Sequence, residues 1–313
     1  MAGLGISGRL LGTDITNASP ALQEVDEVFL VSPAQSLSYI SEIKKIVVDH
    51  NVGLLIPLTD LDLRSLSRRR EEFAQLGCTV MVGEESVVKL CRDKRRFAKH
   101  LGKAGLPTIR TFSLEAFRKK PFYPCFAKPL HGSAGHGTAM IRTGRELRAH
   151  LHVFGRQLMV QDYIPGQEYT IDVYRTREGE IKSIVPRQRL RVRGGEVDQA
   201  VTVRDEELVA ATHQLVDSLD GLWGVFCCQC RRPEGKPPVF FELNPRFGGG
   251  VPLSIAAGAD LPRYLLEDVL GLESTAQLGA FQENLLMLRY RDAFFQTIDD
   301  PTQLPGYETP TFK

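Results

Sequence analysis

A predicted β-hairpin over residues 223–244 constrains this chain more than any other feature of its sequence. The apolar residues 223–232 form the first strand, residues 233–238 have the composition of a turn, and the second strand begins at Val239. A turn centred between Gly235 and Lys236 fixes the register of the hairpin. The register in turn decides which side chains share a face of the sheet.

In that register Gln229 lies directly opposite Glu242, and opposed residues project from the same face. Strict alternation along the second strand puts Phe240, Glu242 and Asn244 on one face and Val239, Phe241 and Leu243 on the other. Arg246 follows, beside a glycine run. Oxygen ligands with a neighbouring arginine suit a hard cation that carries a bound phosphate. The alternative is that Glu242 is an ordinary exposed strand residue and Gln229 its solvated neighbour.

The composition of the chain limits the classes of protein to which it can belong. The 313 residues are 42% hydrophobic and 25% charged, which is typical of a globular protein with room for two or three domains. Lys and Arg number 39 against 38 Asp and Glu, so the net charge favours neither nucleic acid nor an anionic membrane as partner. No apolar run approaches the roughly 20 residues of a spanning helix. The start lacks the order of a secretory signal, which predicts a cytoplasmic protein.

The first third of the chain alternates short apolar strands with helical stretches. Strands are expected at 10–12, 27–31, 53–58 and 79–82, and helices at 34–51 and 61–76. That order predicts a parallel α/β sheet. Most such domains open with a strand, a glycine turn and a helix, and this chain begins after them. Either the start is trimmed or one strand-helix unit is missing, which would leave a sheet edge exposed.

Two lysines stand in unusual places. A helix expected over 85–103 carries Lys94 within an apolar stripe, where the ammonium needs an anion or a route to solvent. Lys128 lies near the end of a strand over 122–130. A loop follows in which Gly132, Ser133, Gly135 and Gly137 can bring backbone N–H groups close to phosphate oxygens. The loop is not a Walker sequence, and a plain hairpin turn is the alternative.

Residues 158–174 form two further strands separated by the turn signal Pro165-Gly166. Gln161 could present backbone groups to the edge of an adenine, with apolar cover from Tyr163 and Ile164. Glu168 could accept hydrogen bonds from ribose hydroxyls. Taken alone, this segment looks like any β-hairpin.

The order of these pieces along the chain resembles the ATP-grasp superfamily over about residues 10–272. The members of the set are Lys94, Lys128 with its glycine loop, Glu168 after a Pro-Gly turn, Gln229, and Glu-x-Asn-Pro-Arg at 242–246. The most similar members are the ATP-grasp half of carbamoyl-phosphate synthetase large subunits and the stand-alone proteins like it. The resemblance implies an α/β pre-domain over 1–88, a linker helix and lid subdomain over 89–158, and a C-terminal subdomain over 159–313.

The resemblance also implies roles for individual residues. Lys94 and Lys128 would contact ATP phosphates under the loop of Gly132, Ser133, Gly135 and Gly137. Tyr163 and Ile164 would form the adenine hinge, Gln161 would contact adenine or ribose, and Glu168 would bind ribose. Gln229, Glu242 and Asn244 would bind two Mg²⁺ (or Mn²⁺) ions. Arg246 would lie beside the transferred phosphate and act in catalysis with Lys128. Arg193 falls where the synthetases have a histidine.

The acceptor is expected between the segment 246–250, including Gly248 and Gly249, and a basic strand. Alternation puts Arg187, Arg189, Arg191 and Arg193 on one face of that strand, where they would attract an anion. A solvated stripe is the alternative for at least two of them.

The resulting prediction is an ATP-dependent ligase that joins a small-molecule carboxylate to an amine or a thiol through an acyl phosphate, with release of ADP and phosphate. Two alternatives stay open. One is phosphorylation of bicarbonate or carbamate, as in carbamoyl-phosphate synthetase. The other is a non-catalytic ATP-binding subunit. A homodimer or a partner subunit is compatible with each of them.

Overall fold

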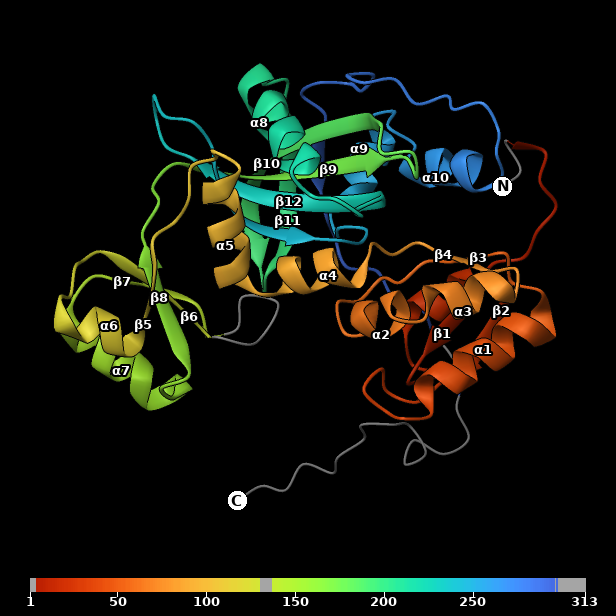
Figure 1. Cartoon of the computed structure of the whole chain (residues 1–313), viewed down its shortest axis with the longest axis horizontal. Coiled ribbons are helices and arrows are strands. Elements are labelled where there is room, and N and C mark those ends of the chain that lie inside the picture. The colour runs from red at the N-terminus through yellow and green to blue at the C-terminus, as the bar shows by residue number, and fades with distance from the viewer. Residues whose placement is uncertain (1–3, 130–136, 296, 298–313) are drawn as a thin grey trace. The chain divides into compact units, whose positions relative to one another are not determined.

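The computed structural model describes residues 4–129, 137–295 and 297, and the chain divides into two compact units (Figure 1). The first unit holds the described residues up to Val80 together with those from Tyr290 onward. The second unit is Met81–Arg289. None of the helices in the described part of the chain has both the length and the apolar composition needed to cross a membrane.

The strands of the first unit pair in parallel, as predicted from the sequence, but the described strands form two two-stranded sheets and not one sheet. Its strands form two parallel pairs: β1 (Leu11–Asp14) with β2 (Glu27–Leu30), and β3 (Leu54–Leu55) with β4 (Thr79–Val80). Its helical elements are η2 (Pro20–Glu24), α1 (Tyr39–His50), α2 (Leu63–Ser67) and α3 (Arg70–Gln75). In α1 the residues Tyr39, Ile43 and Val47 recur every four positions and form the buried stripe. The single helix expected over 61–76 is wrong, because the backbone leaves helical geometry at Arg69.

The second unit opens with two helices where one was predicted. Helix α4 (Glu85–Arg92) ends at Asp93, which has an extended backbone, and α5 (Lys94–Lys103) begins directly after it. The Asp93 carboxylate accepts the backbone N–H groups of Arg95 and Arg96 at 3.0 and 3.2 Å. This N-cap favours a new helix start over a continuous helix. Lys94 is therefore the first residue of α5.

A four-stranded antiparallel sheet forms a small subdomain. Its strand order is β5 (Thr111–Ser113), β8 (Leu158–Asp162), β6 (Cys125–Pro129) and β7 (Ala139–Ile141). Helices α6 (Leu114–Lys119) and α7 (Gly144–Phe154) bury Leu114, Phe117 and Leu147 in one core with Cys125 and Ala127. Both helices therefore cover the same face of this sheet (Figure 1).

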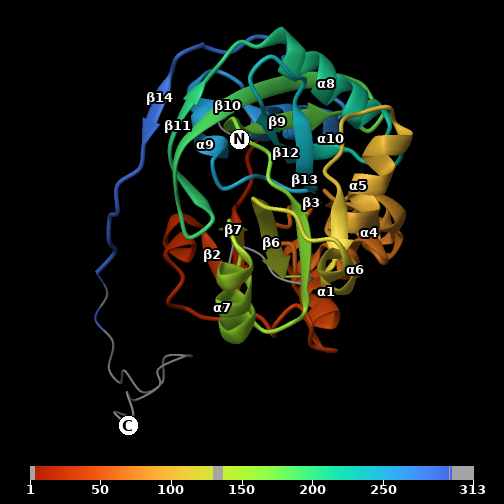
Figure 2. The same ribbon diagram turned by 90° about the vertical axis from the view of Figure 1, so that its left-hand side faces the viewer.

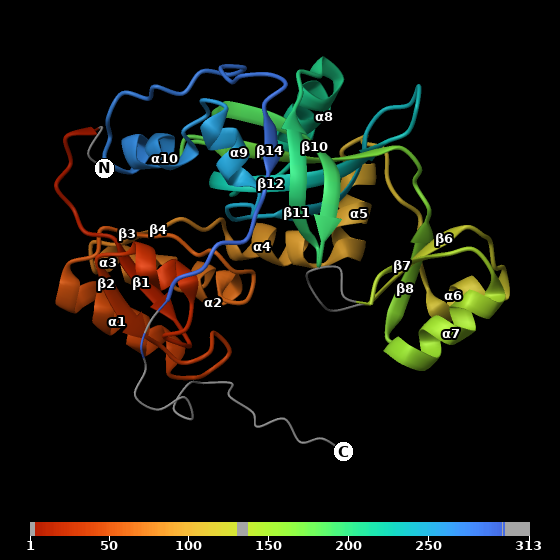
Figure 3. The same cartoon turned by 180° about the vertical axis from the view of Figure 1, so that it is seen from behind.

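A six-stranded antiparallel sheet makes up most of the rest. Figure 2 shows its strands in order, from β14 (Leu286–Leu288) through β11 (Glu196–Thr202), β10 (Ile181–Arg193), β9 (Gln167–Arg175) and β12 (Gly224–Arg232) to β13 (Val239–Asn244). Figure 3 shows β14 alongside β11 at one edge. Helices α4, α5 and α8 (Glu206–Asp217) pack on one face in a shared core.

The other face of this sheet carries polar side chains. Helices α9 (Val251–Ala256) and α10 (Leu261–Val269) follow β13. Ser254 of α9 contacts Asp172, whose neighbours in β9, Ile171 and Val173, belong to the opposite core. Alternation along β9 thus separates an apolar face from the polar face that holds the site.

Candidate functional site

A cavity of about 800 Å³ lies in the second unit between α5, the four-stranded sheet and the six-stranded sheet. Ten residues predicted for the site line it: Lys94, Lys128, Gly137, Gln161, Tyr163, Ile164, Glu168, Arg189, Gln229 and Glu242. These residues span almost 150 positions of sequence, and the fold brings them to one place. Gly132, Ser133 and Gly135 lie outside the described residues.

The register predicted for the β12–β13 hairpin is confirmed where it matters for the site. Gln229 pairs with Glu242, and Cys227 pairs with Asn244. The buried amide of Asn244 donates through Nδ2 to Oε1 of Glu242 at 3.2 Å. The three oxygen-bearing side chains therefore project from the same side of neighbouring strands.

The strict alternation predicted along β13 is wrong, because the strand contains a bulge. The register shifts between Gln229 and Cys230, so Cys230 pairs with Phe240 and Phe241 is the extra residue. Phe240 packs in the core with Leu243, while Phe241 and Glu242 both line the cavity. The bulge thus adds an aromatic ring to the polar face.

Lys128 projects into the cavity from β6. Its Nζ lies 4.8 Å from the centre of the Phe241 ring and 5.4 Å from that of Phe126. Burial lowers the pKa of Lys128 to about 8, and the charge of Lys94 adds to this effect, while the charge of Glu242 opposes it. The ammonium is therefore desolvated and loses its proton at a lower pH than an exposed lysine, unless an anion binds beside it.

Glu168 carries an ion-pair network at another wall of the cavity. Nη2 of Arg231 lies 2.8 Å from its carboxylate, and Nε of Arg189 lies 3.3 Å from it. Arg231 was not among the predicted site residues, although its position two residues after Gln229 puts it on the same face of β12. On β8, Nε2 of Gln161 donates to Oγ1 of Thr111 at 2.9 Å, which fixes that amide in the sheet.

The prediction that four arginines share one face of β10 is wrong. The strand changes register on both sides of Arg191, so alternation does not hold across it. Arg189 lines the cavity, whereas Arg191 is 57% exposed and lies 3.5 Å from Asp198. Arg193 is exposed and is not among the residues that line the cavity.

Arg187 lies beneath the surface in a buried ion pair. Its Nε and Nη2 donate to the two carboxylate oxygens of Asp172 at 2.7 and 2.9 Å, and Ser254 donates to the same carboxylate. Its Nη1 is buried and has no hydrogen-bond partner among the residues that the structure describes. A Cβ at Gly250 would lie 2.3 Å from that nitrogen, so the glycine allows the backbone to pass directly over the guanidinium.

Gly248 and Gly249 pack closely in the same turn. A Cβ at Gly248 would lie 2.9 Å from Sγ of Cys227, and one at Gly249 would lie 2.8 Å from Glu196. Arg246, just before the turn, donates through Nη1 to the Phe247 carbonyl at 2.9 Å. None of the three is among the cavity-lining residues, so their proposed contacts with substrate stay predictions.

The donor set beside Lys128 suits a divalent cation of the magnesium type. Gln229 and Asn244 supply carboxamide oxygens and Glu242 a carboxylate, all hard ligands. Within the described ranges no group of three or more His, Cys, Asp and Glu residues is placed to hold a metal. A site of this composition, with one acid, would hold its cation together with an anionic ligand.

Two family models match separate parts of the chain. Residues 155–292 match a family described as ATP-grasp in the biosynthetic pathway with Ter operon. Residues 3–81 match a PylC-like N-terminal domain. No curated protein matches the chain.

Solved structures share the fold at low sequence identity. The biotin carboxylase domain of Hydrogenobacter thermophilus 2-oxoglutarate carboxylase, solved with MgADP, ADP and bicarbonate, has a TM-score of 0.70 at 18% identity, over 91% of this chain and 69% of its own. Biotin carboxylase from Campylobacter jejuni has a TM-score of 0.70 at 15% identity, over 91% and 70%. N5-carboxyaminoimidazole ribonucleotide synthetase from Thermus thermophilus has a TM-score of 0.67 at 18% identity, over 88% and 75%.

These matches agree with the resemblance to the ATP-grasp superfamily read from the ordered residues of the sequence, and they add a family match for the first unit. The chain therefore has the ATP-grasp fold, with a PylC-like N-terminal domain preceding its ATP-grasp region.

Proposed function

We propose that this protein is an ATP-dependent ligase that phosphorylates a small carboxylate and then joins it to an amine or a thiol. The observation that carries the proposal is the convergence of Lys94, Lys128, Gln229 and Glu242 on one cavity. Two cations for phosphate and a carboxylate with amide oxygens for a divalent metal form a complete set for phosphoryl transfer. The structural neighbours solved with ADP, MgADP or an ATP analogue support this use of the fold.

The nucleotide would lie across the cavity. The backbone around Tyr163 and Ile164, just after β8, would meet the adenine edge, and Glu168 would accept from ribose hydroxyls once released in part from Arg189 and Arg231. Lys94 and Lys128 would contact the phosphates. Binding of the polyanion would stabilise the charged form of Lys128, whose burial otherwise disfavours it.

Gln229, Glu242 and Asn244 would hold Mg²⁺, which when bound neutralises phosphate charge and polarises the γ-phosphoryl group. An oxygen of the acceptor carboxylate would attack the γ-phosphorus, and the bond from that phosphorus to the bridging oxygen would break to release ADP. The amine or thiol would then attack the acyl carbon. Phosphate would leave with the bonding pair, and the nucleophile would lose its proton. Lys128 and Arg246 would stabilise the charge on the moving phosphoryl group.

The acceptor would enter between Arg189, the 246–250 turn and the metal ligands. A neighbour solved with bicarbonate supports a small carboxylate-like acceptor, so bicarbonate belongs in the substrate panel.

The test is release of ADP and phosphate by the purified full chain with Mg²⁺ and ATP, across amino acids, dicarboxylates, bicarbonate, amines and thiols. Turnover that requires both a carboxylate and a nucleophile supports ligation. Turnover with bicarbonate alone would replace ligation by carboxyphosphate formation. Thermal stabilisation by ATP without turnover on any pair would leave only a nucleotide-binding role.

A further inference from the structure

The charges of this chain are distributed unevenly along the sequence. Residues 89–158 hold 16 Lys and Arg against 3 Asp and Glu, whereas the other 243 residues hold 23 against 35. The net charge of the whole chain is therefore close to zero although residues 89–158 are strongly basic. Asymmetry of this kind indicates an anionic partner for the basic part.

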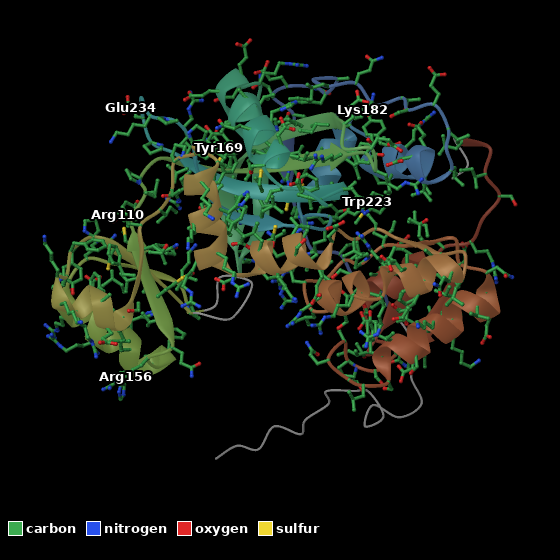
Figure 4. All side chains as sticks on the ribbon, viewed as in Figure 1. Arg110, Arg156, Tyr169, Lys182, Trp223 and Glu234 are labelled. Atoms are coloured by element: carbon green, nitrogen blue, oxygen red, sulfur yellow. The ribbon has the colours of Figure 1, made fainter. Side chains whose placement is uncertain are left out.

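Much of the excess lies on the helical side of the four-stranded subdomain. Six exposed side chains on and beside α6 and α7 have no acidic partner among the described residues: Arg118, Lys120, Arg142, Arg145, Arg148 and Arg156. We name this surface the basic face. Of the two acids in α6 and α7, Glu115 lies 4.0 Å from Lys119, and Glu146 accepts a backbone N–H. Figure 4 shows Arg156 below α7, pointing away from the ribbon.

The nucleotide of the proposed reaction cannot be the ligand of the basic face, because the face and the cavity lie on opposite sides of the sheet. In β6, Cys125 and Ala127 point into the core beneath α6 and α7, whereas Phe126 and Lys128 line the cavity. The helices separate the basic side chains from that side. A different anion is needed to account for them.

We propose that the basic face binds the phosphate backbone of a nucleic-acid duplex without sequence preference. Five of the six side chains are arginines, whose planar guanidinium groups match phosphate oxygens in pairs. A surface of this composition binds through phosphate contacts and counterion release. Among the described residues of α6, α7 and their flanks, the exposed large apolar side chains are Tyr123, Val153 and Phe154, fewer than the six cations. The centre of a stable protein interface is instead depleted in charge.

The aromatic side chains of the subdomain favour a duplex over a single strand. The Phe117 and Phe122 rings lie 5.2 Å apart in a T-shaped contact, and Phe112 packs on Phe122 at 5.4 Å. Tyr123 packs on Phe117, and Phe154 packs on His150. Single strands are held by bases stacked on accessible rings. Phe117 is buried and Phe112 and Phe122 are partly buried, so of these rings only Tyr123 and Phe154 are exposed, at 37% and 44%.

The test measures binding of the full chain, without ATP, to a fluorescein-labelled duplex of roughly 20 base pairs, in DNA and RNA form, by anisotropy between about 50 and 200 mM salt. The variant Arg145→Glu/Arg148→Glu/Arg156→Glu should lower affinity at least tenfold and reduce the slope of log K against log salt by about 3. Arg118→Glu/Lys120→Glu should also weaken binding. Unchanged thermal midpoints show that each variant is folded.

The matched control is Arg9→Glu/Lys45→Glu/Lys236→Glu, which changes net charge equally at exposed sites outside the basic segment. This control should bind like the parent chain. The proposal is overturned if the control loses as much affinity, or if the parent shows no binding at the lowest salt. It is also overturned if polyglutamate or anionic vesicles compete as well as unlabelled duplex. Vesicles matter because Val153 and Phe154 are exposed at the end of α7. No step of this test uses ligase activity.

Discussion

Glu242 is the residue on which the proposed reaction depends most, because it supplies the carboxylate of the predicted metal site. Glu242→Gln keeps the shape of the side chain and removes its charge. We expect ADP release to fall by about two orders of magnitude or more, with the thermal midpoint nearly unchanged. Glu234→Gln, at an exposed acid in the hairpin turn (Figure 4), is the control and should keep full activity. Equal activity of the two variants would contradict the metal assignment.

Lys128 gives the site a pH dependence with a defined sign. Burial holds its pKa at about 8, so the ammonium of the free protein loses its proton as pH rises through that value. Phosphate binding needs the charged form, and ATP affinity should therefore fall between about pH 7.5 and 9.

Lys128→Arg replaces the ammonium with a guanidinium that stays protonated over this range. The fall in ATP affinity should then disappear, whatever the absolute affinity of the variant. Titration of Mg-ATP by intrinsic fluorescence at several pH values measures both proteins. A parent chain with constant affinity from pH 7 to 9.5 would be inconsistent with phosphate binding by Lys128.

The Asp172–Arg187 pair is a stability determinant beneath the site. Both side chains are 1% exposed, so Asp172→Ala would leave a buried guanidinium without its counter-charge. We expect the free energy of unfolding to drop by about 3 to 5 kcal/mol. Asp198→Ala breaks the exposed pair with Arg191 in the same sheet and should cost less than about 1 kcal/mol. Urea unfolding measures the loss in the free energy of unfolding for each variant. Similar losses for the two variants would show that burial does not determine how much an ion pair contributes to stability.

At the scale of elements, the sequence predicts which strand residues pair better than it predicts the face of the sheet to which each side chain points. The Gln229–Glu242 register follows from one turn composition and is confirmed. The bulge at Phe241 and the register changes around Arg191 depend on packing of both faces of the sheet, which no local pattern encodes. The boundary between α4 and α5 at Asp93 does have a local sequence signal, because aspartate is a common N-cap residue. The apolar stripe continues across Asp93, however, and therefore predicts one continuous helix.

The turn between β8 and β9 joins the two sheets next to the cavity. One position in this turn requires glycine. Gly166 has a φ of +99°, and an added Cβ would lie 2.0 Å from the Arg232 carbonyl oxygen. Gly166→Ala should destabilise the protein by about 3 kcal/mol or more, from left-handed strain and from the clash with backbone.

Gly235→Ala is the matched comparison, because Gly235 also has positive φ (+63°) but has open space around it. It should cost only the strain, about 1 to 2 kcal/mol. Chemical denaturation of both variants separates the two contributions. A smaller loss at Gly166 than at Gly235 would mean that the backbone near Arg232 moves away freely.

At the scale of the whole molecule, the fold class and the ordered set of site residues could be predicted, but their surroundings could not. Lys94, Lys128, Glu168, Gln229 and Glu242 all line one cavity. Arg231, which pairs with Glu168, and Phe241, which lies beside Lys128, were not predicted as neighbours of these residues. Their contacts form only in the folded chain. The boundaries predicted at residues 88 and 158 stay predictions, as do the individual roles of the site residues.

The division into two units yields a last prediction. Every residue assigned to nucleotide or metal lies between 94 and 246, inside the unit Met81–Arg289. A bound Mg-ATP analogue should therefore slow amide hydrogen exchange at the start of α5, in β6, at the β8–β9 turn and in the β12–β13 hairpin, because ligand binding suppresses local opening there. Exchange in β1, β2 and α1 of the first unit should not change. Exchange measured by mass spectrometry with and without the analogue resolves these segments, and protection of β1 or α1 equal to that of β6 would show that the first unit takes part in nucleotide binding.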